Sequence, residues 1–224
     1  TQTVTGPPWV GHSGGLTHLE LSPDGTLLAS ADAVGAIILW ATSDTLWPIR
    51  STLTGHPNNV QSLAFSPDGE RLASGGGLDQ VLLWDWSDGQ PISQTLQHTI
   101  PLTLPVSALT LSQDGKLAIT GSENGSLRFW DMNSGEVASP SLLGPVGGVT
   151  ALMISPDGTQ VAFGGPIGTA WLADVAQQQV VTILNGHTAP VRDLAFSPDG
   201  LLLASVADDG ALVIRELVAG QGTS

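Results

Sequence analysis

The sequence contains no cysteine and few basic residues. Its 224 residues include 6 Lys and Arg against 20 Asp and Glu, so the net charge is −14, and Lys116 is the only lysine. The absence of cysteine excludes disulfides, thiolate metal sites and cysteine nucleophiles. Because an acidic surface repels phosphate groups, we expect binding neither to nucleic acid nor to an anionic membrane.

Long apolar runs are also missing. The longest, Ala36 to Ala41, is far shorter than the roughly 20 residues that a membrane helix needs. Hydrophobic residues nevertheless make up 41% of the chain, which allows a sizeable core, and charged residues only 12%. The 28 glycines and 15 prolines suit many tight turns. The length allows one large all-β domain or two small ones.

One four-residue phrase recurs five times along the chain. Its last residues are Gly25, Gly69, Gly115, Gly158 and Gly200, spaced 44, 46, 43 and 42 residues apart. Four copies read Ser-Pro-Asp-Gly and the third reads Ser-Gln-Asp-Gly. Proline presets φ, aspartate bonds the backbone ahead and glycine takes a positive φ, so the phrase predicts a tight turn.

Short apolar stretches flank every copy of the turn, as in Leu63–Phe65 and Leu72–Ser74. They are rich in Val, Ile and Leu and are bounded by turn residues, which is typical of β-strands. No segment shows sustained helical periodicity. Each repeat therefore predicts four short antiparallel strands joined by three turns and a longer link.

Two further dipeptides make the repeat specific. Gly-His occurs at 11–12, 55–56 and 186–187, and Trp-Asp at 84–85 and 130–131. With the turn and a Leu-Ala-Ser stretch, this framing resembles the WD-repeat family over residues 11–216, and in particular its bacterial members. The resemblance implies one β-propeller domain of about five four-stranded blades, because a lone blade cannot bury both of its faces. The implied units are 11–54, 55–97, 98–143, 144–185 and 186–224.

The resemblance also implies how the ring closes. Residues 1–10 would supply the outer strand of the last blade, with Trp9 in the place of Leu53. Pro7 and Pro8 tolerate only an edge position in such a strand. A partial propeller completed by self-association, and a piece of a longer protein, stay open as alternatives.

In the family, a structural network joins the His of Gly-His, a Ser or Thr on the second strand, an Asp or Asn in the next turn and the Trp. Here the matching residues are His12, Ser30 and Trp40; His56, Ser74 and Trp84; Thr120, Asn124 and Trp130; and His187, Ser205 and Asp209. No copy is complete. Val34 occupies the turn position of the first unit, Asp79 falls one place late, and Arg215 replaces the last Trp. The fourth unit has none of the set, and Trp171 partly fills the gap at Ala173.

Repeated Ser, His and Asp residues could suggest a hydrolase. An active site is built once, however, and this trio recurs in several units, so the structural role is the better interpretation. Each turn offers a single Asp, too few for calcium, and the five His lack metal-ligand spacing. We therefore expect no enzymatic activity, cofactor or metal.

We expect a scaffold that binds a protein or peptide partner through loops on one propeller face. A regulatory or sensor domain of a larger protein is the alternative. The expected partner-binding residues lie in the links that enter each unit and in the facing turns: Asn58, Asn59, Ile100, Leu102, Leu104, Arg192 and Asp208. The link with Ile100, Leu102 and Leu104 is long, apolar and stiffened by proline, so it packs on the propeller or contacts a partner. Cytoplasm is the default compartment for the family.

Overall fold

The computed structural model describes residues 8–43, 49–77, 80–85, 92–95, 105–137 and 141–217. Within these ranges all regular structure is β-strand, arranged in five antiparallel sheets, which confirms the all-β prediction. We call the sheets blades 1 to 5 in chain order.

Consecutive strands build each blade. Blade 1 contains β1 (Leu16–Leu21), β2 (Leu27–Asp32), β3 (Ala36–Ala41) and β4 (Ile49–Thr54). Blade 2 contains β5 (Val60–Phe65), β6 (Arg71–Gly76), β7 (Gln80–Asp85) and β8 (Ile92–Thr95). Blade 3 contains β9 (Val106–Leu111), β10 (Leu117–Ser122), β11 (Ser126–Asp131) and β12 (Leu142–Leu143). Blade 4 contains β13 (Ala151–Ile154), β14 (Gln160–Gly164), β15 (Ala170–Asp174) and β16 (Gln179–Leu184). Blade 5 contains β17 (Val191–Phe196), β18 (Leu202–Ala207) and β19 (Leu212–Glu216).

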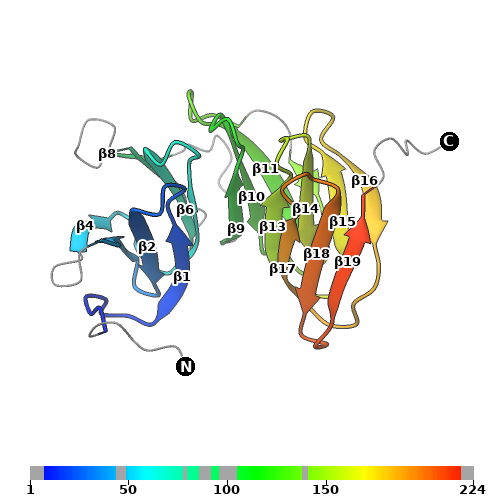
Figure 1. Cartoon of the computed structure of the whole chain (residues 1–224), viewed down its shortest axis with the longest axis horizontal. Coiled ribbons are helices and arrows are strands. Elements are labelled where there is room, and N and C mark those ends of the chain that lie inside the picture. The colour runs from blue at the N-terminus through cyan, green and yellow to red at the C-terminus, as the bar shows by residue number, and fades with distance from the viewer. Residues whose placement is uncertain are drawn as a thin grey trace.

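The blades follow one another along an arc, from blue blade 1 at the left of Figure 1 to orange and red blade 5 at the right. The first strands of successive blades lie side by side, β1 next to β5, then β9, β13 and β17. Apolar side chains fill the seams between blades. In the first seam, Ala29 and Ile37 of blade 1 share a buried cluster with Leu63 and Trp84 of blade 2. Burying one such large side chain stabilises the fold by about 1.5–3 kcal/mol.

The five repeated turns share one geometry. In the first, the Ser22 hydroxyl donates to Asp24 Oδ1 at 2.6 Å, and the Gly25 N–H donates to the Ser22 carbonyl at 2.8 Å. Gly25 has a φ of 71°, which favours glycine. The hydrogen bond from Ser22 lowers the pKa of Asp24 to about 2. The serine, the aspartate and the glycine of the phrase thus all serve to form the turn.

Only residues 8–10 of the expected closing strand lie within the described ranges, so closure of the last blade by the N-terminal segment stays a prediction. In the described chain, blade 5 has three strands and no strand pairs with β19 on its outer side. Residues 8–15 are not β-strand, and the Trp9 ring stacks on Trp40 of blade 1 with centroids 5.6 Å apart. Trp9 is therefore held by blade 1, and residues 1–7 of the expected strand lie outside the described ranges.

Candidate functional site

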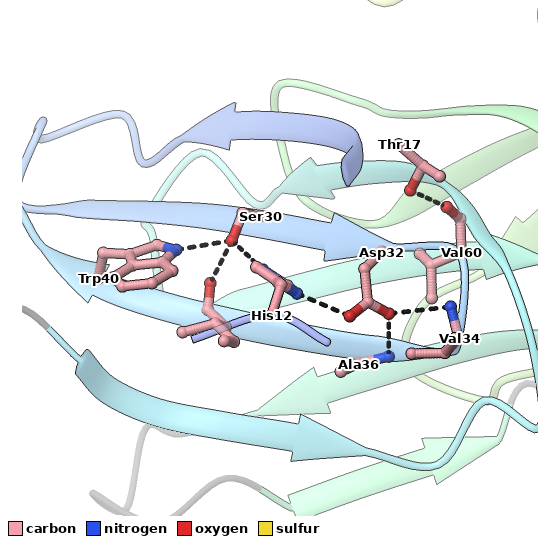
Figure 2. A network of polar contacts seen from close by, with 9 residues as sticks. His12, Thr17, Ser30, Asp32, Val34, Ala36, Trp40 and Val60 are labelled. Carbon is pink, nitrogen blue, oxygen red and sulfur yellow. Dashed lines mark hydrogen bonds and ion pairs between the residues drawn. The ribbon is translucent and has the colours of Figure 1, made fainter. Parts of the chain in front are cut away.

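Blade 1 contains a buried polar network that crosses the sheet (Figure 2). His12 Nε2 lies 2.6 Å from Ser30 Oγ, and Trp40 Nε1 donates to the same hydroxyl oxygen at 2.6 Å. His12 Nδ1 lies 2.9 Å from a carboxylate oxygen of Asp32. Asp32 is fully buried, and its other oxygen accepts the N–H groups of Val34 and Ala36. Both oxygens of this carboxylate thus form hydrogen bonds within the blade.

Sequence reasoning missed Asp32. It located the acid at the position of Val34, two residues later, because the fifth unit has Asp209 there. The sequence does contain one indication of its role. Asp32 is a carboxylate at the end of β2, where the other units have uncharged residues: Gly76, Ser122, Gly165 and Ala207.

Blade 2 repeats the network around Ser74. Its hydroxyl oxygen lies 2.7 Å from His56 Nε2 and accepts Trp84 Nε1–H at 2.8 Å. Burial lowers the pKa of His56 to about 4, so this imidazole is neutral at pH 7. Asp79, the acid expected for this unit, lies outside the described residues.

In the part of blade 3 that the structure describes, the network joins the threonine and the tryptophan. Trp130 Nε1 donates to Thr120 Oγ1 at 2.9 Å. Asn124 Oδ1 accepts the backbone N–H and the hydroxyl of Ser126, within its own turn. The amide oxygen of Asn124 thus stabilises a short Asx-type turn, and His98 of this unit lies outside the described residues.

Blade 4 replaces the polar network with apolar groups. Phe163 occupies the position of the Ser or Thr, and its ring stacks on Trp171 with centroids 5.9 Å apart and planes 9° apart. Pro145 stands in the place of the histidine, and Ala173 in that of the tryptophan. Phe163, Trp171 and Ala173 share one apolar cluster, so Trp171 packs beside the residue that replaces the missing indole.

Blade 5 has the polar set without the tryptophan. His187 Nε2 lies 2.8 Å from Ser205 Oγ, and His187 Nδ1 lies 3.2 Å from both carboxylate oxygens of Asp209. Asp209 also accepts the Thr188 N–H at 2.8 Å. The Arg215 guanidinium takes the place of the indole and packs against Gly186, where an added Cβ would lie 2.7 Å from it.

The Ser-His-Asp geometry of blades 1 and 5 resembles a hydrolytic triad in its distances, but Ser30 is not placed for attack. Ser30 is 2% exposed, and its oxygen already accepts the indole N–H of Trp40. A nucleophile must reach a substrate carbonyl, and the Ser30 hydroxyl is buried and bonded to His12 and Trp40 within its own blade. Within the described chain no three His, Asp or Glu side chains converge as metal ligands. The described chain also forms no apolar helix of the length that a bilayer requires.

The expected partner-binding residues lie on two blades. Asn58 and Asn59 are half-buried in the link that enters blade 2, and the Asn59 carbonyl accepts the Gly77 N–H at 2.9 Å. The side-chain oxygens of both Asn residues are enclosed and have no hydrogen-bond partner among the described residues. Arg192 and Asp208 form an exposed ion pair on blade 5 through two guanidinium nitrogens. Ile100, Leu102 and Leu104 lie outside the described residues.

Successive four-stranded antiparallel sheets, joined by Ser-x-Asp-Gly turns and pinned by His–Ser–Trp contacts, define a protein of the β-propeller class. The chain belongs to the WD domain, G-beta repeat family, whose sequence profile matches residues 5–40, 47–85, 90–131 and 178–215, together more than half of the chain. The matched ranges leave out residues 132–177, where blade 4 has its apolar replacement.

Several curated proteins are similar to part of the chain. The meiotic recombination protein rec14 of Schizosaccharomyces pombe is 30% identical over 111 residues, which cover 49% of this chain and 36% of rec14. The LST8 homolog of Drosophila melanogaster is 28% identical over 114 residues, covering 51% of this chain and 36% of that protein. Pre-mRNA-processing factor 19 of Oryza sativa is 30% identical over 132 residues, covering 56% and 24%. The chain thus spans about a third or less of the length of these relatives.

Proposed function

We propose that the chain is a non-catalytic scaffold that binds a protein or peptide partner on the face formed by the links entering each blade. The proposal rests on how the chain uses its histidine and serine side chains, the groups that could otherwise act as base and nucleophile. Histidine and serine side chains in blades 1, 2 and 5 are bonded to each other inside the blade. Membership of a family whose proteins are generally non-enzymatic scaffolds supports the same function.

The face with the entering links offers polar groups that the fold leaves unused. The amide oxygens of Asn58 and Asn59 have no partner among the described residues. An enclosed acceptor without a donor costs about 1–3 kcal/mol. Both oxygens are enclosed in the free chain, so these amide side chains must turn outward to accept a peptide N–H or a lysine side chain of a partner. On blade 5, the exposed Arg192–Asp208 pair adds one charge of each sign to this face.

Site-specific photo-crosslinking tests the proposed face. A photoreactive residue is introduced at Asn58 or Arg192, and matched controls carry it at Glu70 or Lys116, exposed positions in the turns at the opposite end of the blades. We expect one protein from source-cell lysate to crosslink from the first two positions and not from the controls. Crosslinking of that protein from the control positions instead would contradict the proposed face.

The sequence predicts that the apolar link with Leu102 and Leu104 contributes to the same face. Changing both residues to Asp is expected to abolish partner binding while the melting temperature stays unchanged. A collapse of the melting temperature would show that the link packs on the propeller as part of the core.

A further inference from the structure

Two loops of blade 4 expose apolar side chains on the face formed by the entering links. Val146 lies in the link that enters blade 4 and is 83% exposed, and Ile167 lies in the turn between β14 and β15 and is 61% exposed. The neighbouring blades have polar residues at the position of Ile167, Asn124 in blade 3 and Asp209 in blade 5. Single exposed apolar residues are common on protein surfaces, whereas a continuous apolar patch marks an interaction site.

The two loops pack against each other, so their exposed side chains share one surface. An added Cβ at Gly147 would lie 2.8 Å from Pro166 Cγ. Val146 directly precedes Gly147, and Ile167 directly follows Pro166. Both side chains therefore emerge beside the same contact, and neither loop contains a charged residue. We call Val146 and Ile167 the apolar pair.

The interior beneath the apolar pair is already filled. Val149 of β13 packs on blade 3, where an added Cβ at Gly121 would lie 2.6 Å from it. Val191 of β17 packs on blade 4 at the same distance from an added Cβ at Gly164. Both valines are at most 1% exposed. The apolar pair thus stands above closed seams and fills no space between blades.

An exposed carboxylate borders the apolar pair on the side of blade 3. An added Cβ at Gly148 would lie 2.9 Å from the Glu123 carbonyl, so the link that contains Val146 lies against the turn that contains Glu123. The six basic residues of the sequence all lie in the described ranges: Arg50, Arg71, Lys116, Arg128, Arg192 and Arg215. Within those ranges none of them forms an ion pair with Glu123, so this carboxylate is open to a lysine or arginine of a partner.

Blade 5 places a second carboxylate on the other side of the apolar pair. An added Cβ at Gly168, the residue after Ile167, would lie 2.5 Å from the His187 carbonyl, so this turn packs on the link that enters blade 5. In that link the Thr188 N–H donates to Asp209 at 2.8 Å. Hydrogen bonds from backbone N–H groups, that of Thr188 foremost, lower the pKa of Asp209, so it is ionised at pH 7. The apolar pair therefore lies between carboxylates of blades 3 and 5.

We propose that Val146 and Ile167 dock a segment of a partner protein in which an apolar side chain lies next to a lysine or arginine. The inference rests on the proposed function and narrows the binding face to blade 4. Protein interfaces commonly have an apolar centre and a polar rim. Here the apolar pair supplies the centre, and the carboxylates of blades 3 and 5 select a basic partner by charge complementarity. The net charge of −14 disfavours an acidic segment.

A display library of random short peptides supplies the probe. Peptides are selected on the wild-type chain and counter-selected on the double variant Val146→Ser/Ile167→Ser, which removes the apolar surface without changing charge. Because both side chains are exposed, the double variant should retain the wild-type melting temperature. We expect the selected peptides to carry lysine or arginine next to a large apolar residue.

Fluorescence anisotropy then measures the affinity of one labelled, selected peptide. Val146→Ser and Ile167→Ser should each weaken binding by about tenfold. Val34→Ser is the matched control, since Val34 holds the position of Ile167 in blade 1 and is 55% exposed, and it should leave the affinity unchanged. Glu123→Gln should weaken binding by about two- to fivefold and reduce its dependence on salt.

Several results would overturn the proposal. They are selected peptides with acidic flanks, peptides that bind the double variant as tightly as the wild-type chain, and an affinity that Glu123→Gln leaves unchanged. Self-association of the wild-type chain that Val146→Ser abolishes would assign the surface to a second copy instead. If the protein that crosslinks from Asn58 and Arg192 binds the double variant at full strength, the proposed function holds and the role of the apolar pair is refuted.

Discussion

Replacing Ser74 by Ala tests how much one buried network stabilises its blade. Ser74 is 0% exposed, and its hydroxyl oxygen is the common partner of Trp84 Nε1 at 2.8 Å and His56 Nε2 at 2.7 Å. Removing the hydroxyl leaves two enclosed ring nitrogens without that partner. A buried group left unpaired costs about 1–3 kcal/mol, so Ser74→Ala is expected to lower the free energy of unfolding by about 2–4 kcal/mol.

Ser122→Ala is the matched control. Ser122 is 1% exposed, and its hydroxyl has no hydrogen-bond partner among the described residues. Because an unpaired buried hydroxyl stabilises nothing, its removal should be neutral or slightly stabilising. For a chain of this length, 1 kcal/mol shifts the melting temperature by about 2–4 °C. Ser74→Ala should therefore melt roughly 4–16 °C below Ser122→Ala in calorimetry. Melting temperatures within about 1 °C of each other would refute the argument.

Three further predictions concern charge and packing. Burial lowers the pKa of His56 to about 4, so the fold favours neutral His56, and its contribution is lost as pH falls from 6.5 to 4. His56→Gln should remove up to about 3 kcal/mol of that pH dependence in urea titrations; an unchanged pH profile would contradict it. Burial raises the pKa of Glu20 to about 7, although a hydrogen bond with the Phe65 backbone acts to lower it. The free energy of unfolding therefore falls as pH rises from 4.5 to 7. Glu20→Gln should recover about 1–2 kcal/mol at pH 8 and nothing at pH 4, and equal effects at both pH values would show that charge is not the cause. Phe163→Ala should cost about 3–5 kcal/mol, because the ring is fully buried and stacked on Trp171, whereas a cost below about 1 kcal/mol by urea unfolding would mean that Trp171 fills the space alone.

The repeat itself was predictable because local chemistry determines it. The Ser-x-Asp-Gly phrase needs only neighbouring residues to form its turn, and its spacing indicated one blade per unit. Asp32 was missed because a carboxylate can reach the histidine from either of two positions in the repeat. One is the position of Asp32 in the first unit, and the other, two residues later, is the position of Asp209 in the fifth. From sequence alone, a shift of two residues is invisible without the pairing of β1 with β2.

The placement of Trp9 was not predictable in the same way. The resemblance to the family indicates a place for Trp9 in a closing strand, whereas its ring stacks on Trp40 of blade 1 with centroids 5.6 Å apart. Trp9 precedes the first repeat, so the repeat pattern contains no information about the ring on which it packs.

Blade 4 shows that the features that form a blade differ from the polar network that stabilises its interior. It has neither the histidine, the hydroxyl nor the tryptophan of the network, yet it is a four-stranded sheet like blades 1 to 3. It retains the turn at Gly158, and Val191 of blade 5 packs against Gly164, where an added Cβ would lie 2.6 Å from a valine methyl group. The turn spacing and the apolar seam therefore suffice for the blade, and the interior beneath can be polar or aromatic. A polar network requires every member to be satisfied, whereas the stack of Phe163 on Trp171 requires only volume. We expect the blades to differ in stability according to how completely each interior is paired or filled, with no matching difference in their shape.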